Sequence, residues 1–367
     1  MDREYTVFIN ADAMGKSIQG AGGAIVLGVV FKSLISRVQM VKGNQNIYPE
    51  RWLKNSYIEL QSIFESFEGS MLISAVFGLI DNETGCMYYI NAEHPWISIY
   101  RDEKTIFIEN ALSLHKIGTH LMSQSFSVKV YQLEDGDSIF IGSDGKDDVL
   151  LSYDSEGYRV INEEESRFLQ KVDDAKGDLE LLYDKLVEGV ELSDDFSVLK
   201  ITYQNTNLTE YRRIDSSIKT LLEKASAFEE KNDFTNAKKE YDNAYEIHSK
   251  NLAILKKRAS LYFKMKDYSK ANLLFQECAE LEPANSILLF NIQVTAKAAG
   301  NLDMAINFGE RIHIRDPYWI ENLYELSDSY YKSGNIDRAI KILQFAEALS
   351  SKDPKVKRLY DRLHASN

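Results

Sequence analysis

YTVFINADAMGKS, from Tyr5 to Ser17, is the stretch of this 367-residue chain that decides the fold of its first half. Its first five residues are β-branched or aromatic, and such residues favour a β-strand. Asp12 follows at the expected strand end, and Gly15 permits a tight turn before an apolar run of helical length. A carboxylate held at a strand end is well placed for metal chemistry. Alternatively, Asp12 only caps the helix that follows.

Around this turn the sequence predicts helices and antiparallel strands. Helices are expected over Ile18–Val38 and Glu50–Phe67, and one or two more within Glu163–Val190. The expected strands are Met71–Ile80, Met87–Asn91, Trp96–Tyr100, Thr105–Ile108, Phe126–Leu133, Ser138–Ile141 and Phe196–Tyr203. This order predicts an α+β layered domain over residues 1–204, in which antiparallel sheets are flanked by helices.

Three acidic sites share one context, because each lies where an expected strand meets a turn. They are Asp12, Asp144 in the SDG turn, and Asp194 with Asp195 beside it. If their strands are neighbours, the carboxylates converge and need cations to be tolerated together. Oxygen ligands favour hard divalent ions such as Mg²⁺ or Mn²⁺. The alternative is that SDG and DD are ordinary turn sequences.

The second half of the chain has a 34-residue period. Small or polar residues recur at Ala225, Ala259, Gln293 and Ser327, and alanines at 237, 271, 305 and 339. This spacing resembles the tetratricopeptide repeat, a pair of antiparallel helices. We expect a polar linker over 205–217 and an all-α solenoid over 218–367, made of four repeats and a capping helix at Pro354–His364.

Composition narrows the function classes. The net charge of −13 argues against a nucleic-acid partner, since phosphate recognition needs clustered Lys and Arg. The two cysteines, Cys86 and Cys278, have no metal-binding spacing and suit a reducing compartment. The start of the chain has no secretion signal, and its longest apolar run, Gly20–Phe31, is shorter than a membrane span. We therefore expect a cytoplasmic protein with no membrane span.

Four ordered motifs in residues 5–203 resemble the metal-dependent (type 2C-like, PPM-type) serine/threonine protein phosphatases, in the bacterial branch named after SpoIIE. The segment DAMGKS at Asp12–Ser17 resembles that branch's D-x-x-G-K-G segment. The hairpin Phe77–Trp96 ends in NAEHP, where the branch has N-A-G-H-P. Leu133–Asp148 resembles its L-x-x-G-D and S-D-G pair, and Ser193–Ile201 resembles its closing D-D strand.

The resemblance implies a centre of two Mn²⁺ or Mg²⁺ ions. Asp12 would bridge the ions, with the backbone carbonyl of Ala13 contributing. Asp144 and Asp194 would be further ligands, with Asp195 as the alternative to Asp194. Metal-bound water would be the nucleophile, so no side chain is expected to act as one.

The sequence departs from the branch at three places. Ser17 replaces the second glycine of G-K-G, and Glu93 replaces the glycine of N-A-G-H. The branch also carries a G-G-D strand upstream of the Asp12 motif, and we expect that strand to be absent here. Either the start of the chain is truncated or the metal site is incomplete.

Two functions follow as hypotheses. The first is metal-dependent dephosphorylation of phosphoserine or phosphothreonine on a regulatory protein, which by analogy includes anti-sigma-factor antagonists, with the repeats recruiting a partner or sensing a signal. The second is a non-catalytic scaffold in which a degenerate phosphatase fold presents a peptide-binding repeat array. Candidates for that array's concave face are Arg258, Tyr262, Gln293 and Asn322.

Overall fold

The protein is described by a computed structural model. It describes residues 3–15, 18–40, 47–112, 114–120, 126–162, 164–189, 191–192, 195–205, 211, 214–350, 354 and 357–360. The chain forms two compact units, Met1–Asn205 and Thr206–Asn367, and each is considered by itself. The expected linker over 205–217 lies largely outside the described residues, and the first repeat helix begins at Ser216.

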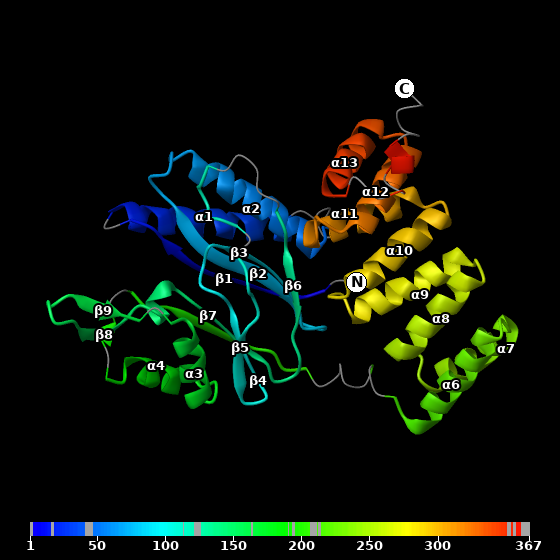
Figure 1. The fold of residues 1–367 in the computed structure, drawn as a ribbon, viewed down its shortest axis with the longest axis horizontal. Helices are drawn as coiled ribbons and strands as arrows, with labels where there is room; N and C mark the ends of the chain where they lie inside the picture. Colours follow the sequence, from blue (N-terminus) through cyan, green and yellow to red (C-terminus); the bar gives the residue numbers. More distant parts are fainter. Residues whose placement is uncertain are drawn as a thin grey trace. The chain divides into compact units, whose positions relative to one another are not determined.

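The first sheet of the N-terminal unit has the strand order β1-β2-β3-β6 and is antiparallel throughout. Helices α1 and α2 lie side by side over one face of it (Figure 1). Every residue of β2 and β3 is buried, whereas β1 is mostly half-buried, as expected at a sheet edge. The elements are β1 (Tyr5–Ala13), α1 (Ile18–Met40), α2 (Pro49–Glu65), β2 (Ile73–Asp81), β3 (Cys86–Ala92) and β6 (Lys129–Gln132).

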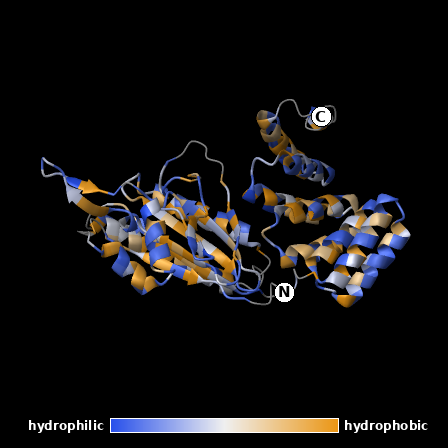
Figure 2. Cartoon of the chain, turned by 60° about the horizontal axis from the view of Figure 1, so that its bottom comes forward, coloured by the Kyte–Doolittle hydropathy of each residue, from blue (hydrophilic) through white to orange (hydrophobic). Residues whose placement is uncertain are grey.

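The second sheet has the order β11-β7-β4-β5, and two short helices cover its outer face. Phe140 from the sheet packs there against Phe168 and Leu182 from the helices. Hydrophobic residues concentrate on the central strands (Figure 2). The predicted class, antiparallel sheets flanked by helices, is confirmed. The elements are β4 (Ser98–Arg101), β5 (Lys104–Phe107), β7 (Ser138–Gly142), α3 (Ser166–Asp174), α4 (Leu179–Val187) and β11 (Val198–Thr202).

A third, three-stranded sheet was not predicted. It is formed by β8 (Val149–Tyr153), β9 (Arg159–Ile161) and β10 (Glu191–Leu192), in the order β10-β8-β9. All of β9 and the last three residues of β8 are exposed. A strand that buries no face carries no alternation of apolar and polar residues, and the sequence pattern therefore gave no signal for it.

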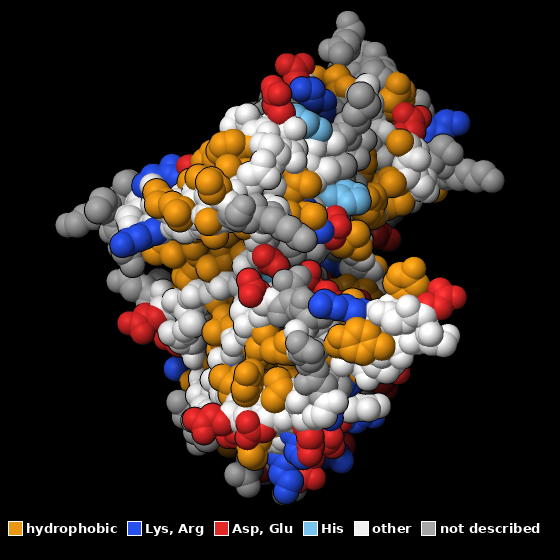
Figure 3. Space-filling model, turned by 90° about the vertical axis from the view of Figure 1, so that its left-hand side faces the viewer, with side chains coloured by type: hydrophobic (Ala, Val, Ile, Leu, Met, Phe, Trp, Pro, Cys, Tyr) orange, Lys and Arg blue, Asp and Glu red, His pale blue; other side chains and the backbone are white. Residues whose placement is uncertain are grey.

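Helix α1 is apolar on nearly all sides, but only a narrow stripe of it is buried. That stripe contains Leu27, Phe31 and Leu34, whereas Ile25 and Val29 are 67% and 64% exposed. On the face shown in Figure 3, hydrophobic side chains are exposed to solvent between charged ones. By length and composition alone, Ile18–Val38 could cross a membrane, contrary to the expectation that no segment is long enough. In the structure its buried stripe covers the first sheet.

The C-terminal unit consists of paired helices, and the tetratricopeptide architecture is confirmed. Each pair turns at a residue with positive φ, followed by an Asp or Asn whose side chain accepts a hydrogen bond from the backbone three residues on. These capping residues are Asp233, Asp267, Asn301 and Asn335. The helices are α6 (Ser216–Glu230), α7 (Phe234–Ile247), α8 (Leu252–Lys264), α9 (Tyr268–Leu281), α10 (Ser286–Ala298), α11 (Leu302–Arg315), α12 (Ile320–Lys332) and α13 (Ile336–Leu349).

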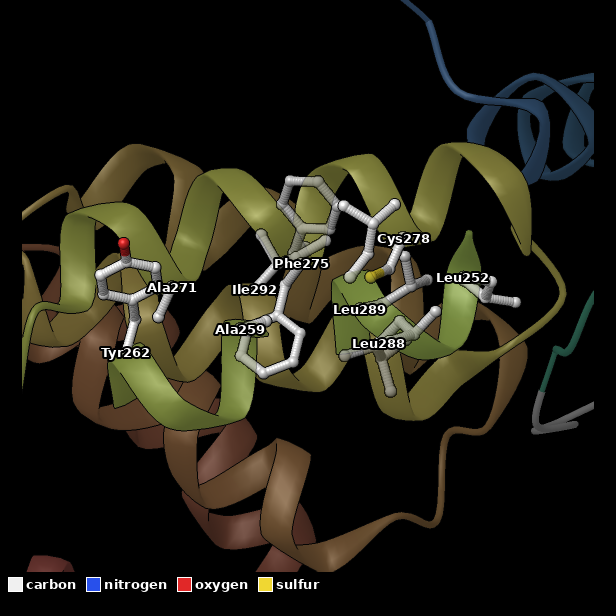
Figure 4. Close-up of a cluster of buried hydrophobic side chains, with 12 residues drawn as sticks. Leu252, Ala259, Tyr262, Ala271, Phe275, Cys278, Leu288, Leu289 and Ile292 are labelled. Carbon is white, nitrogen blue, oxygen red and sulfur yellow. The ribbon is translucent and has the colours of Figure 1, made fainter. Parts of the chain in front are cut away.

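The repeat core explains the residues that the 34-residue period singles out. Tyr262, Phe275, Leu289 and their neighbours form one buried hydrophobic cluster from α8, α9 and α10, in which Tyr262 lies beside Ala271 and Leu289 beside Cys278 (Figure 4). Gln293 takes a position where the other repeats have Ala or Ser, and Gly309 makes room for it, since a Cβ on Gly309 would lie 2.5 Å from the amide nitrogen.

Burial therefore removes most of the expected concave-face candidates. Gln293 and Asn322 are 0% exposed and Tyr262 is 8% exposed, and assigning them to a binding surface was wrong. Arg258 donates to Asp242 at 2.9 Å and lies over the ring of Tyr245. These side chains hold the repeats together. Of the expected capping tail, Pro354 and residues 357–360 are described, and they are helical.

Lys266→Gly should stabilise the repeats. Lys266 lies two residues past the end of α8 and has φ +61°, whereas the equivalent positions before Asn301 and Asn335 are glycines. A left-handed conformation disfavours side chains with a Cβ, so the substitution should raise the free energy of unfolding by about 0.5–1 kcal/mol. Thermal unfolding followed by circular dichroism checks this. Lys257→Gly, in the interior of α8, should instead lower stability by about 1 kcal/mol.

Candidate metal centre

Two of the predicted acidic segments are neighbours at one end of the second sheet. Strand β7 ends at Gly142, which pairs with Val198 at the start of β11. Asp144 therefore follows one strand and Asp195 precedes its neighbour. Asp144 begins the short 3₁₀ helix η2 (Asp144–Lys146), and both carboxylate-bearing residues are exposed.

Ser143 fastens these two segments together. Its amide donates to the carbonyl of Ser197 at 3.0 Å, and its hydroxyl lies 3.3 Å from the carbonyl of Asp195. The amide of Ser197 lies 3.1 Å from the same hydroxyl. Gly145 permits the approach, because a Cβ there would lie 2.1 Å from the Asp195 carbonyl oxygen. A residue without a side chain is therefore required at the centre of SDG.

The first sheet joins this site through Asn10. Its side-chain amide lies 3.4 Å from the hydroxyl of Ser197, which links β1 to the segment before β11. Asp12 is two residues further along β1, so its side chain leaves the same face of the strand as that of Asn10. Asp12 is half-buried opposite Ser74, and Ala13 is the last residue of β1, opposite Ile73. Gly15, with φ +112°, makes the turn that the sequence predicted.

His94 is the centre of a hydrogen-bond network that sequence reasoning missed. Its Nε2 lies 2.8 Å from the amide oxygen of Asn10, and its Nδ1 lies 2.8 Å from the hydroxyl of Ser74. Its backbone amide donates to Asn91. Since an amide oxygen only accepts, Nε2 carries the proton. The histidine thus ties β1, β2 and the end of β3 together, and the NAEH sequence was the available signal.

Burial keeps His94 neutral. The ring is 4% exposed, and burial, followed by the positive charge of Lys146, lowers its pKa to about 4. The unfolded chain, in which His94 has a pKa of about 6.5, binds the proton first as the pH falls. His94 is consequently a positioning residue and not a proton donor at neutral pH.

The free energy of unfolding should decrease as the pH is lowered, because the unfolded chain protonates His94 more readily than the folded chain does. Its contribution is fully present above about pH 6.5 and is lost as the pH drops toward 4, where the loss reaches about 3 kcal/mol. Urea unfolding at a series of pH values measures this. His94→Gln should flatten that window, and His115→Gln should leave it unchanged. Equal slopes in both variants would contradict the assignment.

Lys146 of the SDGK turn faces inward and not toward the acids. It is 3% exposed, forms an ion pair with Asp147, and lies 4.8 Å from the ring centre of Phe168. Burial raises the pKa of Asp147, and the neighbouring ammonium of Lys146 opposes that rise. The turn is therefore anchored on the helix layer by its lysine, which leaves Asp144 at the surface.

Glu93 occupies the position where the phosphatase branch has glycine, and it keeps the conformation that glycine favours, with φ +51°. Its carboxylate lies 3.2 Å from His115 Nδ1 and 3.7 Å from Lys116 Nζ, and it accepts from the Lys116 amide at 3.4 Å. The departure from the family pattern thus has a structural use, because the side chain fastens the segment after Leu114 to the end of β3.

The donor set suits hard divalent cations, since the acids at this end offer carboxylate oxygens and the strand end offers the Ala13 carbonyl. Asp194 lies outside the described residues. Within the described part of the chain, no group of three or more His, Cys, Asp or Glu side chains is close enough to hold a metal ion. The structure brings the Asp144 and Asp195 segments together and joins the β1 strand to them, and the ligand set itself stays a prediction.

Comparison with known proteins agrees with both halves of this description. The family model of stage II sporulation protein E (SpoIIE) matches residues 2–204, and a tetratricopeptide-repeat model matches residues 257–285. No curated protein sequence matches the chain.

Solved structures with partial similarity include three of note. The RsbU and RsbW domains of a Mycobacterium tuberculosis protein are 15% identical over 55% of this chain and 54% of that one, with a TM-score of 0.41. A double mutant of MamA RS-1 is 13% identical, and the match covers 42% of this chain and 86% of that one, with a TM-score of 0.40. A tetratricopeptide repeat protein from Parabacteroides merdae is 19% identical, and the match covers 41% of this chain and 59% of that one, with a TM-score of 0.38.

The resemblance found in the motifs is confirmed by the family match, which spans more than half of the 367 residues. The chain therefore belongs to the stage II sporulation protein E (SpoIIE) family, here followed by tetratricopeptide repeats.

Proposed function

We propose that this chain is a metal-dependent protein phosphatase that removes phosphate from phosphoserine or phosphothreonine of a regulatory protein. The observation that carries the proposal is the fastening of the Asp144 turn to the Asp195 segment by Ser143, with β1 joined to the Asp195 segment through the bond of Asn10 to Ser197. The family match over residues 2–204 supports the same reaction class.

Asp12, Asp144 and Asp194, with the Ala13 carbonyl, would hold two Mn²⁺ or Mg²⁺ ions. When bound, such ions supply hydroxide at neutral pH and stabilise charge on a phosphoryl group. The chain's own contribution is to hold the strand ends: Ser143 fixes the spacing of two segments, and neutral His94 fixes Asn10. Since Asp144 is exposed, a phosphorylated side chain on another protein can reach this end of the second sheet.

The repeats would recruit the phosphoprotein or a regulator, because tetratricopeptide arrays bind peptides and proteins. An anti-sigma-factor antagonist is the substrate we favour. The low number of cysteines, two buried thiols in 367 residues, supports a cytoplasmic location, where thiols stay reduced.

The test is turnover of p-nitrophenyl phosphate and of a phosphothreonine peptide by the full chain as Mn²⁺ is titrated in. We expect a rate that saturates with Mn²⁺ and vanishes with a chelator. A folded chain that turns over neither compound at millimolar Mn²⁺ would refute catalysis. That result would favour the second candidate, a scaffold that presents the repeats.

A further inference from the structure

The hairpin of β8 and β9 carries large apolar side chains that the described part of the chain leaves open to solvent. Five of them are between 38% and 67% exposed, namely Leu151, Tyr153, Tyr158, Val160 and Ile161. Val160 and Ile161 are neighbours in β9, and neighbouring residues of a strand point to opposite faces. Apolar side chains are therefore exposed on both faces of the hairpin. Contiguous exposed apolar groups of this kind mark interaction sites.

The base of the hairpin is fastened to the turn that bears Asp144. Asn162, which follows β9, is 8% exposed, and its side-chain amide donates to the carbonyl of Asp147 at 3.0 Å. The backbone amide of Asn162 donates to the carbonyl of Val149 at 2.9 Å, and the amide of Val149 donates to Asp147 at 2.9 Å. The hairpin thus begins five residues after Asp144 and is held to that turn by hydrogen bonds from both of its strands.

The third strand of this small sheet leads to the other acidic segment. Strand β10 pairs with the start of β8, with Leu192 opposite Val149, and Asp195 follows three residues later. Figure 1 shows β8 and β9 side by side, extending away from the two larger sheets. A protein segment whose phosphoryl group reaches Asp144 therefore comes within reach of the hairpin.

The length of the hairpin sets which residues of such a segment it can contact. Five residues separate Val149 from Asp154 at the tip, which corresponds to about 17 Å at about 3.3 Å per residue. An extended peptide has nearly the same rise per residue. Side chains within about five positions of the phosphorylated residue can therefore lie against the hairpin.

Charge selects the chemistry of the partner. Between Asp148 and Glu165 the sequence has six acidic residues and one basic residue, Arg159. Four of these acids are exposed at the tip and base of the hairpin, namely Asp154, Glu156, Glu164 and Glu165. Protein interfaces combine an apolar centre with a polar rim, and an acidic rim is complementary to Lys and Arg.

We propose that the β8–β9 hairpin is a docking arm for the phosphoprotein substrate. It binds a segment that carries Leu, Ile or Val together with Lys or Arg within about five residues of the phosphoserine or phosphothreonine. Tyr153, Tyr158 and Val160 supply the apolar contacts, and Glu156 and Glu164 attract the basic side chains. This inference rests on the proposed function, because it takes Asp144 as the place where phosphate is removed.

Fluorescence anisotropy with two labelled phosphothreonine peptides tests the apolar contacts on the full chain. One peptide has Leu and Lys on both sides of the phosphothreonine, and the other has Ser and Glu at the same positions. The wild type should bind the Leu/Lys peptide at least about tenfold more tightly. Tyr158→Ser combined with Val160→Thr should weaken that binding about tenfold. Ile106→Thr removes an equally exposed apolar side chain from β5 and should leave it unchanged.

Glu156→Lys tests the charge of the arm. It should weaken binding of the Leu/Lys peptide about threefold and strengthen binding of the Ser/Glu peptide by a similar factor. Loss of fold cannot produce such a gain. Glu103→Lys, at the exposed turn between β4 and β5, makes the same change in net charge and should move neither affinity.

Turnover of p-nitrophenyl phosphate by the wild type separates this inference from the proposed function. Equal affinities for the two peptides, or a preference that survives Tyr158→Ser with Val160→Thr, would overturn the docking arm whether or not p-nitrophenyl phosphate is turned over. A preference that depends on the hairpin in a chain that turns over no phosphate compound would count against the proposed function alone. A wild-type dimer in light scattering that the hairpin variant converts to a monomer, without any peptide preference, would assign the hairpin to a second copy and also overturn the arm.

Discussion

Asp12→Asn and Asp144→Asn should each lower Mn²⁺-dependent turnover by about 1,000-fold, which corresponds to about 4 kcal/mol of activation free energy. Asparagine keeps the shape of aspartate but removes the charge that attracts the ions and one strong oxygen donor. Folding should be little affected at Asp144, because that residue is exposed. The apparent Mn²⁺ affinity should fall together with the rate.

Steady-state kinetics over a Mn²⁺ series, with thermal unfolding of the same samples, separates lost chemistry from lost fold. Asp184→Asn, an exposed acid on α4 away from the strand ends, is the control and should retain full activity. Asp194→Asn and Asp195→Asn, measured side by side, decide which of these adjacent acids is the ligand. Unchanged rates in both the Asp12 and Asp144 variants would show that the metal centre does not lie at these strand ends.

Gly145→Ala should lower turnover by a similar factor, about 1,000-fold, although it changes no acid. The new Cβ would lie 2.1 Å from the Asp195 carbonyl oxygen, well inside any van der Waals contact. The backbone near Asp195 must therefore move away, which breaks the hydrogen bonds of Ser143 and separates the two acidic segments. Overpacking of this kind typically also costs about 1–3 kcal/mol of stability.

Gly28→Ala serves as the matched control, because a Cβ at that helical position meets nothing within 4 Å. It should leave activity unchanged and raise helix stability slightly. If Gly145→Ala keeps wild-type activity and wild-type melting temperature, the close approach of the two segments has no role in the reaction.

Most of the fold could be predicted from residue patterns because most elements bury a face. The nearly continuous apolar run of β2 and the 34-residue period of the repeats both report burial, and both gave the correct elements. The sheet of β8, β9 and β10 could not be found in this way, because its strands are mostly exposed. An exposed strand leaves no hydrophobic pattern in the sequence, and pattern analysis therefore does not predict it.

The candidate site was only partly predictable, for a different reason. Asp12 and Asp144 could be named because each follows an apolar run, which is a local signal. The bonds of His94 to Asn10 and Ser74 join residues 20 to 84 positions apart, and no spacing in the sequence encodes them. The inward turn of Lys146 is likewise decided by tertiary packing against Phe168.

The position of β11 in the second sheet has a consequence for folding during synthesis on the ribosome. This strand, Val198–Thr202, is the last described strand of the N-terminal unit, yet it pairs along the whole of β7. The acidic segments therefore cannot be brought together until residue 202 has left the exit tunnel. The second helix of each repeat that follows has its own capping residue, and each repeat contacts only its neighbours, so folding can propagate along the array as successive pairs emerge. Synthesis thus delays the site until the whole first unit is available, and then adds the repeats one pair at a time.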